Sequence, residues 1–236
     1  MTKYMEIAND IRNQIVKGIL KPNEQLLFEK NLSKIYCSSK MTIKKALDIL
    51  VAEGLIVKRR GSGTFVKSIN SSEMDKLIVS NQFRGFSALY SGRKIDTEVL
   101  VFQVVNCDEK IRTKLNLEEE QFVYNIVRVR SVDNVPYVIE NTYMPINIIQ
   151  GLKKAHANNS IYSFIEEDLG LKIQSSHRKI SVRKSNTFEQ EHLHLETHDP
   201  VAIAEQVAYL DNGTAFEYSV AVHSYNYFSF ETVIIR

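Results

Sequence analysis

A glycine-rich segment between two apolar runs constrains the fold of the first part of the chain most strongly. Residues 55–57 are Leu-Ile-Val, residues 64–66 are Thr-Phe-Val, and Lys-Arg-Arg-Gly-Ser-Gly joins them. Runs of β-branched and aromatic residues on both sides of such a turn predict a β-hairpin. Glycine has no Cβ atom, so the tip of this hairpin can come close to another molecule. The sequence therefore predicts a hairpin whose glycine tip follows three cations.

Three helices are predicted before this hairpin. Apolar residues recur at steps of three and four over residues 4–15, and Gly18 then ends the pattern. A second short helix fits residues 29–36. Ser38 and Ser39 are candidate N-caps of a third helix, which ends at Gly54. We expect the following residues of the second and third helices to face inward: Leu32, Ile35, Tyr36, Ile43, Ala46, Leu47, Leu50 and Val51. Three helices and a basic hairpin predict a winged helix-turn-helix.

Charge is distributed unevenly along the chain. Residues 1–68 contain 13 lysines and arginines and 6 acidic residues, a balance of +7. Subtraction from the totals of 30 and 28 leaves 17 basic and 22 acidic residues for 69–236, a balance of −5. The first segment suits a polyanionic partner, and the second does not.

The remainder of the chain predicts an α+β domain around an antiparallel sheet. Strands rich in Val, Ile, Tyr and Phe alternate there with short helices, and no repeat or low-complexity tract interrupts them. We expect strands at 99–105, 122–132, 135–143, 173–182, 201–210, 216–224 and 228–235, and helices at 109–117, 160–169 and 187–195. The polar stretch 67–76 indicates a linker. The expected domains are therefore 1–68, with a linker over 69–82, and 83–236.

Cations and hydroxyls at the start of the third helix are candidates for DNA contact. In a helix-turn-helix this end of the helix enters the major groove. Lys40 and Lys44 lie one turn apart on the side away from the apolar stripe, and Ser39 and Thr42 can bond phosphate oxygens. A solvated basic face is the alternative. The basic hairpin directly after this helix favours DNA binding.

The segment MTIKKALDILVAEGLIVKRRGSGTFV, residues 41–66, resembles the signature of the GntR family of bacterial regulators. In that signature a helix beginning near Ser-Arg-x-Thr-Val-Arg leads through Glu-Gly-Leu to a Gly-x-Gly-Thr-Phe-Val wing. The resemblance covers residues 4–66 without a gap. It implies contact with double-stranded operator DNA by Lys30, Ser39, Lys40, Thr42, Lys44, Arg60 and Gly63.

Two departures from the family pattern concern DNA recognition. Leu26-Leu27-Phe28-Glu29-Lys30 stands where family members usually have Leu-Pro-Ser-Glu-Arg, and lysines replace arginines at Lys30, Lys40 and Lys44. Lysine cannot reproduce the two-pronged contact of arginine with guanine. We therefore expect an operator that differs from the common one or is recognised more loosely.

The second part of the chain resembles the effector domain of the HutC subfamily, the UTRA domain, whose fold is like that of chorismate lyase. Ile-Val-Arg-Val-Arg at 126–130, Asn-Val-Pro at 134–136 and Glu-Asn-Thr-Tyr-Met-Pro at 140–145 carry the resemblance, with weaker matches at 85–87, 160–162 and 216–219. The resemblance implies a homodimer and a small-molecule effector, such as a phosphorylated sugar. It assigns effector contact to Phe86, Ser87, Arg128, Arg130, Glu140, Ser160, Tyr162, Glu217 and His223. Members that bind sugar phosphates often have tyrosine at the position of His223.

Arg128 and Arg130 allow two interpretations. They lie two residues apart in a predicted strand, so both point to one face, where they need an anion. Either they pair with a carboxylate such as Glu140 on the adjacent strand, or they hold the phosphate or carboxylate of a ligand. The residues alone favour the structural pair. The resemblance favours the ligand.

Other classes of protein explain the sequence less well. A lyase-like enzyme would need a catalytic constellation, and no Ser-His-Asp or Cys-His arrangement is recognisable. His192, His194 and His198 could be imagined as metal ligands, but solvated histidines are ordinary at a helix end and a turn. A non-specific nucleic-acid-binding protein would leave the second domain unexplained. We therefore expect a transcriptional regulator and not an enzyme, with neither metal nor cofactor. The expected regulator is a repressor that a small anionic metabolite such as a sugar phosphate releases from DNA; an activator, or an effector that is a non-sugar carboxylate, is the alternative.

The composition also bounds the compartment. No apolar run approaches the roughly 20 residues of a membrane span, and charges interrupt the first twenty positions. Cys37 and Cys107 lie in segments with unrelated patterns, which suits free thiols in a reducing compartment. We expect a cytoplasmic protein without a membrane partner.

Overall fold

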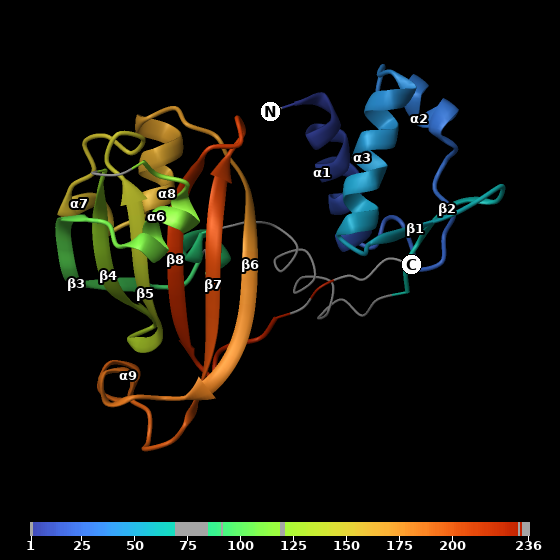
Figure 1. The fold of residues 1–236 in the computed structure, drawn as a ribbon. Helices are drawn as coiled ribbons and strands as arrows, with labels where there is room; N and C mark the ends of the chain where they lie inside the picture. The colour runs from blue at the N-terminus through green and yellow to red at the C-terminus, as the bar shows by residue number, and fades with distance from the viewer. Residues whose placement is uncertain (1, 69–84, 91, 119–120, 231, 233–236) are drawn as a thin grey trace. The chain divides into compact units, whose positions relative to one another are not determined.

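The computed structural model describes residues 2–68, 85–90, 92–118, 121–230 and 232. The chain divides into two units, residues 1–82 with 230–236 and residues 83–229 (Figure 1). The expected linker over 69–82 lies outside the described residues.

The smaller unit has the predicted order of three helices and a hairpin. Its elements are α1 (Lys3–Val16), α2 (Glu29–Ile35), α3 (Lys40–Ala52), β1 (Ile56–Arg59) and β2 (Gly63–Val66). The two strands are antiparallel, and Gln25 forms a bridge with Phe65 beside them. The prediction of a winged helix-turn-helix is confirmed for the described residues.

Apolar side chains of all three helices and both strands form one core in the smaller unit. Its fully buried members include Ile7, Ile43 and Leu50. Arg12 of α1 donates two hydrogen bonds to the buried carboxylate of Glu53, at 2.6 and 2.8 Å, and so fastens α1 to the end of α3. The inward prediction for Ile35 is wrong, because its side chain is 61% exposed. Leu32 and Tyr36 fill the contact of α2 with the core instead.

The larger unit is built on one sheet of six strands. The strands are β3 (Ile95–Asn106), β4 (Phe122–Val132), β5 (Val135–Pro145), β6 (Ile173–Lys184), β7 (Pro200–Leu210) and β8 (Ala215–Ser224). Their order is β3-β4-β5-β8-β7-β6, and all neighbours are antiparallel. The prediction of an α+β domain with an antiparallel sheet is confirmed.

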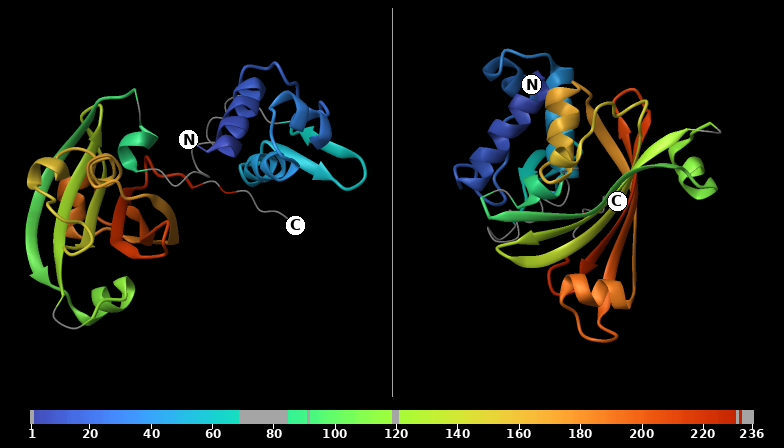
Figure 2. Two further views of the ribbon diagram at one scale, coloured as in Figure 1. Left: turned by 90° about the horizontal axis from the view of Figure 1, so that it is seen from above. Right: turned by 90° about the vertical axis from the view of Figure 1, so that its left-hand side faces the viewer.

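Helices cover both faces of this sheet. They are α5 (Phe86–Leu89), α6 (Glu109–Leu115), α7 (Lys154–Ala157), α8 (Ile161–Ser163), the π-helix η1 (Phe164–Asp168) and α9 (Thr187–Leu193). Figure 2 shows α5, α8 and η1 against one face and α6 and α9 against the other. The first face, which we call the inner face, carries the polar residues described below.

Two predicted elements differ from the structure. The helix expected over 160–169 is a short α-helix followed by η1. The backbone N–H of Leu169, the C-cap of η1, donates to the carbonyl oxygen of Phe164. The strand expected over 228–235 is wrong for the described residues 228–230 and 232, which have no strand pairing. Phe228 packs its ring on His223 instead, with centroids 4.7 Å apart, so its apolar character serves a side-chain contact.

Candidate functional site

The start of α3 is shaped by two hydroxyl groups. Ser39 is the N-cap, and its Oγ accepts a hydrogen bond from the backbone N–H of Thr42 at 3.1 Å. The two hydroxyls also contact each other at 2.9 Å. Ser39 is exposed and Thr42 is half-buried. The cap therefore fixes the first turn of α3 while it keeps both hydroxyls near the surface.

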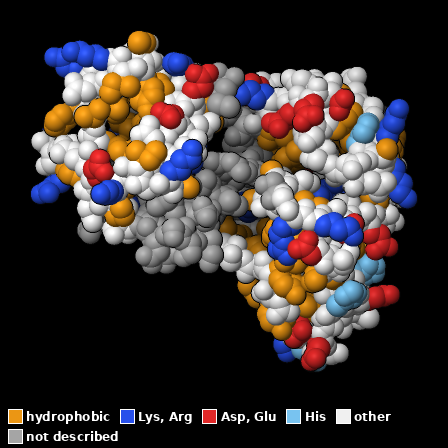
Figure 3. All heavy atoms as spheres, turned by 180° about the vertical axis from the view of Figure 1, so that it is seen from behind, with side chains coloured by type: hydrophobic (Ala, Val, Ile, Leu, Met, Phe, Trp, Pro, Cys, Tyr) orange, Lys and Arg blue, Asp and Glu red, His pale blue; other side chains and the backbone are white. Residues whose placement is uncertain are grey.

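The predicted DNA-contacting lysines project from the smaller unit into solvent. Lys30, Lys40 and Lys44 are exposed, and within the described residues none of them has a carboxylate partner. Their neighbour Lys45 differs, since its ammonium lies 4.0 Å from the centre of the Tyr4 ring. In Figure 3 lysine and arginine side chains (blue) stand out from this unit among exposed hydrophobic side chains. The three lysines keep their charge available for an external anion.

The hairpin tip is glycine-dependent. Gly63 has φ +119°, and a Cβ atom there would lie 2.4 Å from Nε2 of Gln25. That amide donates to the carbonyl of Ser62 at 2.8 Å, so Gln25 fastens the tip to the segment before α2. Arg60 is exposed, whereas Lys58 is paired with Asp48 at 2.6 Å. The structure thus leaves Arg60 free of the contacts that hold Lys58.

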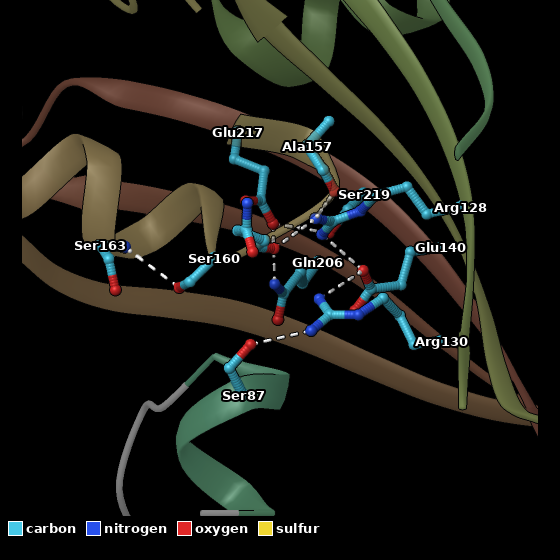
Figure 4. A network of polar contacts seen from close by, with 11 residues as sticks. Ser87, Arg128, Arg130, Glu140, Ala157, Ser160, Ser163, Gln206, Glu217 and Ser219 are labelled. Atoms are coloured by element: carbon cyan, nitrogen blue, oxygen red, sulfur yellow. Dashed lines mark hydrogen bonds and ion pairs between the residues drawn. The ribbon is translucent and has the colours of Figure 1, made fainter. Parts of the chain in front are cut away.

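Two arginines lie side by side on the inner face of the sheet in the larger unit. Arg128 and Arg130 belong to β4, and their side chains are only 8% and 3% exposed. Arg128 donates to Glu140 at 2.6 Å and to the carbonyl oxygens of Ala157 and Asn159 at 3.0 and 3.4 Å (Figure 4). Arg128 and Glu140 are register partners on β4 and β5. The structural pair considered from the sequence is therefore present, but it involves Arg128 far more closely than Arg130.

Arg130 is held mainly by α5. Its guanidinium donates to Oγ of Ser87 at 2.8 Å and lies 4.8 Å from the centre of the Phe86 ring. Its distance from Oε2 of Glu140 is 3.7 Å. Burial lowers the pKa of Arg130, Glu140 acts in the opposite direction, and Arg128 adds to the lowering. The structure brings Phe86, Ser87, Arg128, Arg130 and Glu140 together, as the resemblance implies.

The charges of this cluster do not cancel. Glu140 faces two guanidiniums, and although burial raises its pKa, Arg128 and Arg130 bring the pKa below the ordinary value. The carboxylate is therefore ionised at neutral pH, and the three groups carry a net charge of +1. The Nε atoms of Arg128 and Arg130 are buried and have no hydrogen-bond acceptor within the described residues. Two buried donors and one excess charge make this end of the site suitable for an anion.

A second carboxyl group, Glu217 on β8, has a different environment. Its Oε1 accepts hydrogen bonds from Gln206 at 3.0 Å and from Ser219 at 2.8 Å (Figure 4). Burial raises its pKa, and hydrogen bonds from Gln206, Ser219 and Tyr162 act in the opposite direction. The pKa of Tyr162 is raised well above its ordinary value by burial and by Glu217. Glu217 is thus surrounded by neutral hydrogen-bond donors, unlike Glu140.

The remaining predicted residues border the same region. His223 lies on β8, and burial lowers its pKa to about 4, although Glu140 acts to raise it. The imidazole is therefore neutral at neutral pH. Ser160 caps α8 by accepting the backbone N–H of Ser163 at 3.2 Å. All nine predicted effector residues lie in the larger unit, on the inner face or on the helices over it.

Sequence reasoning missed several members of this cluster. The carbonyl groups of Ala157 and Asn159 come from the segment around α7, which the sequence pattern did not predict. Gln206 is the one polar side chain among Ala202, Ala204 and Ala208 at alternate positions of β7. That alternation was a usable signal, because a glutamine among inward-facing alanines needs a polar partner.

The histidines outside this cluster show no metal site. His192 bonds the carbonyl of Phe188 at 2.9 Å, and His194 and His198 have left-handed backbone conformations in turns. In the described part of the chain, no three His, Cys, Asp or Glu side chains gather as around a metal ion. Nor does any described helix combine the length and apolar character of a membrane span.

Comparison with protein families accounts for both units. Residues 3–66 match the model of bacterial regulatory proteins of the GntR family, and residues 91–229 match the UTRA domain. These matches bear out both resemblances seen in the sequence. They also favour a regulator over an enzyme.

The chain also matches known regulators over most or all of their length. The HTH-type transcriptional regulator GmuR of Bacillus subtilis is 39% identical over 236 residues, which is 100% of each chain. The mannosyl-D-glycerate transport/metabolism system repressor MngR of Escherichia coli is 31% identical over 92% of this chain and 89% of its own. The crystal structure of YydK from Bacillus subtilis, described as a possible transcriptional regulator, matches with a TM-score of 0.76 and 28% identity over 100% of both chains. The chain belongs to the GntR family of DNA-binding transcriptional regulators, and its second unit is a UTRA effector-binding domain.

Proposed function

We propose that the chain represses transcription from an operator that it holds through α3 and the hairpin. Lys40, Lys44 and Lys30 contact phosphates or base edges, and Ser39 and Thr42 bond phosphate oxygens at the start of α3. Arg60 and Gly63 bring the hairpin tip to the adjacent groove. The exposed, unpaired lysines support these roles, and the relative MngR is named a repressor.

The effector is a small anion that binds Arg128, Arg130 and Ser87. The observation that carries this proposal is the excess positive charge of two buried guanidiniums that share one carboxylate, with the hydroxyl of Ser87 beside them. A buried charge without a counter-charge is costly. An anion can supply that counter-charge.

A phosphate group fits this end better than a carboxylate. Phosphate offers three acceptor oxygens and close to two negative charges, whereas a carboxylate offers two oxygens and one charge. Glu217, Tyr162 and His223 face the same region with neutral or hydrogen-bonded groups, which suit hydroxyls. Ser160 borders the same site. These features favour a phosphorylated sugar as the effector.

The regulator acts as a homodimer on a near-palindromic operator, since one small winged helix contacts too few base pairs for specificity. The effector releases the operator by changing the spacing of the two winged helices, which the linker connects to the effector domains. Sedimentation that gives only monomer at micromolar concentration would contradict the dimer. Gel shifts with and without effector decide whether the effector weakens or tightens DNA binding.

Calorimetry with matched ligands tests the effector class. Glucose 6-phosphate, mannose 6-phosphate and cellobiose 6-phosphate are titrated into the full chain, and inorganic phosphate and glucose serve as the phosphate-only and sugar-only probes. We expect at least one phosphosugar to bind more tightly than inorganic phosphate does, and we expect glucose not to bind. The proposed anion site would be contradicted if glucose bound as tightly as glucose 6-phosphate, or if none of the phosphorylated probes bound.

A further inference from the structure

A line of polar side chains crosses three strands at the far side of the effector site from Arg130. Arg178 on β6 is the register partner of Gln206 on β7, and Gln206 is the register partner of Ser219 on β8. Register partners point to the same face of a sheet, so all three side chains lie on the inner face. Neither Arg178 nor Gln206 has a role in the proposal above.

Arg178 determines which way the Gln206 amide faces. Its Nε and Nη2 both donate to Oε1 of Gln206, at 3.0 and 2.8 Å. A guanidinium has only donors, so the atom that it contacts must be the amide oxygen. The amide nitrogen is thereby turned toward Glu217, where Nε2 donates to Oε1 at 3.0 Å.

The hydrogen bonds to Glu217 leave limited capacity for a ligand. A carboxylate offers about four lone-pair positions. Gln206 and Ser219 occupy the two on Oε1, and the hydroxyl of Tyr162 is a third donor to the group. About one acceptor position remains, and its direction depends on the carboxyl plane that Gln206 and Ser219 hold.

Small side chains lie between the two ends of the site. Ala221 of β8 and Ala204 of β7 continue the register line that begins at Glu140. Neither alanine has a side-chain polar group. The remaining acceptor position of Glu217 can therefore bind a hydroxyl of a ligand that lies above these alanines.

We infer that Gln206 and Arg178 are positioning residues that set the specificity for the hydroxyl-bearing end of the effector by fixing the remaining acceptor position of Glu217. This inference rests on the proposed phosphosugar site and adds the residues that select among phosphosugars. Inorganic phosphate needs only the end formed by Arg128, Arg130 and Ser87. Binding of phosphate is therefore independent of Gln206 and Arg178.

The test compares two ligands on the full-length chain. Gln206→Ala and Arg178→Ala are titrated with inorganic phosphate and with whichever of glucose, mannose or cellobiose 6-phosphate binds the wild type most tightly. Lys179→Ala is the matched control, because it removes one cation from the adjacent position of β6, which points to the opposite face. Phosphate binding by each variant also shows whether the variant is folded.

We expect Gln206→Ala to weaken the phosphosugar by about tenfold, the loss of roughly one net hydrogen bond to a charged group. Arg178→Ala should weaken phosphosugar binding by about fivefold, because the Gln206 amide is no longer held in one orientation. In both variants the affinity for inorganic phosphate should stay within about threefold of wild type. Lys179→Ala should leave both affinities within about twofold. The inference would be overturned if the variants lost affinity for phosphate and phosphosugar equally. It would also be overturned if neither variant lost affinity for either ligand. A wild-type chain that binds none of these probes would instead contradict the proposed anion site.

Discussion

The two units present their cations in opposite ways. Lys40 and Lys44 of α3 are exposed and have no carboxylate partner in the described residues, whereas Arg128 and Arg130 of β4 are buried beside Glu140. A surface of exposed lysines suits a large polyanion such as DNA, which releases its counterions when it binds. Buried guanidiniums held by carbonyls and a hydroxyl suit one small anion of fixed geometry. We therefore propose that the exposed lysines serve DNA binding and that the buried arginines serve effector sensing.

The largest effect is expected from removal of both buried arginines. Arg128→Ala with Arg130→Ala should weaken a phosphosugar by a hundredfold or more, because each charge-assisted contact contributes about 1.5–3 kcal/mol. Titration calorimetry measures this loss. Operator affinity of the same variant should stay within a few-fold of wild type.

The purely structural interpretation predicts a different outcome for this variant. Glu140 would be left buried without its partners, the larger unit would unfold, and DNA binding would be lost as well. Thermal unfolding of the variant separates the two interpretations. A folded variant with wild-type phosphosugar affinity would rule out effector contact by these arginines.

Next in size is the response of the buried region to acid. His223 has a pKa of about 4 in the folded chain, and an unfolded histidine titrates near 6.5. The unfolded state therefore binds the proton first, and the contribution of His223 to stability is complete above pH 6.5 and is lost as the pH falls toward 4. We expect a loss of about 2–3 kcal/mol in this window.

The variant His223→Gln isolates this effect. Its side chain does not titrate, so its free energy of unfolding should fall less than that of the wild type between pH 6.5 and 4. Denaturant unfolding at several pH values makes the comparison. His192→Gln is the control, because His192 lies outside the effector site, on α9. If the free energies of unfolding of wild type and His223→Gln ran parallel over this pH range, folding would not change the pKa of His223.

A moderate effect is expected from the exposed lysines. Lys40→Ala with Lys44→Ala should weaken operator binding by about 30-fold and lower the slope of log affinity against log salt by about 2. Fluorescence anisotropy at several salt concentrations gives both numbers. Lys17→Ala with Lys21→Ala removes the same charge from exposed positions between α1 and α2 and is the matched control. Equal losses for the two pairs would mean that only the net charge of the unit matters.

The smallest effect concerns the departure from the family pattern before α2. Phe28 is the N-cap of α2, makes no side-chain cap and is 61% exposed. Phe28→Ser should supply the missing cap and stabilise the smaller unit by about 0.5–1 kcal/mol, which raises its unfolding temperature by a few degrees. Phe28→Ala adds no cap and should show no such gain. Calorimetric unfolding of the three chains decides.

Local sequence signals predicted the smaller unit well. The N-cap at Ser39, the apolar stripe of α3 and the glycine tip depend on residues close together in the chain. Ile35 was predicted wrongly because Leu32 and Tyr36, which were also predicted to face inward, fill the contact of this short helix with the core. In a helix of two turns, periodicity alone does not show which neighbouring apolar residues reach the core.

Prediction of the effector site depended more on the family resemblance, because many of its contacts join residues far apart in the sequence. The pairing of Arg128 with Glu140 follows from a hairpin register and could be predicted. The contacts of Arg128 with Ala157 and Asn159, and of Arg178 with Gln206, join segments 28 to 31 residues apart. No pattern within one strand specifies such partners, although the lone glutamine among alanines on β7 indicated that one exists.

We propose that an anion bound by Arg128 and Arg130 controls DNA binding by α3 and the hairpin. Anisotropy of labelled operator, titrated with the tightest-binding phosphosugar, tests it for the wild type and for Arg128→Ala with Arg130→Ala. We expect the wild type to release the operator, and the variant to hold it at phosphosugar concentrations a hundredfold higher. Release of the operator from the folded variant at the wild-type concentration would contradict the account.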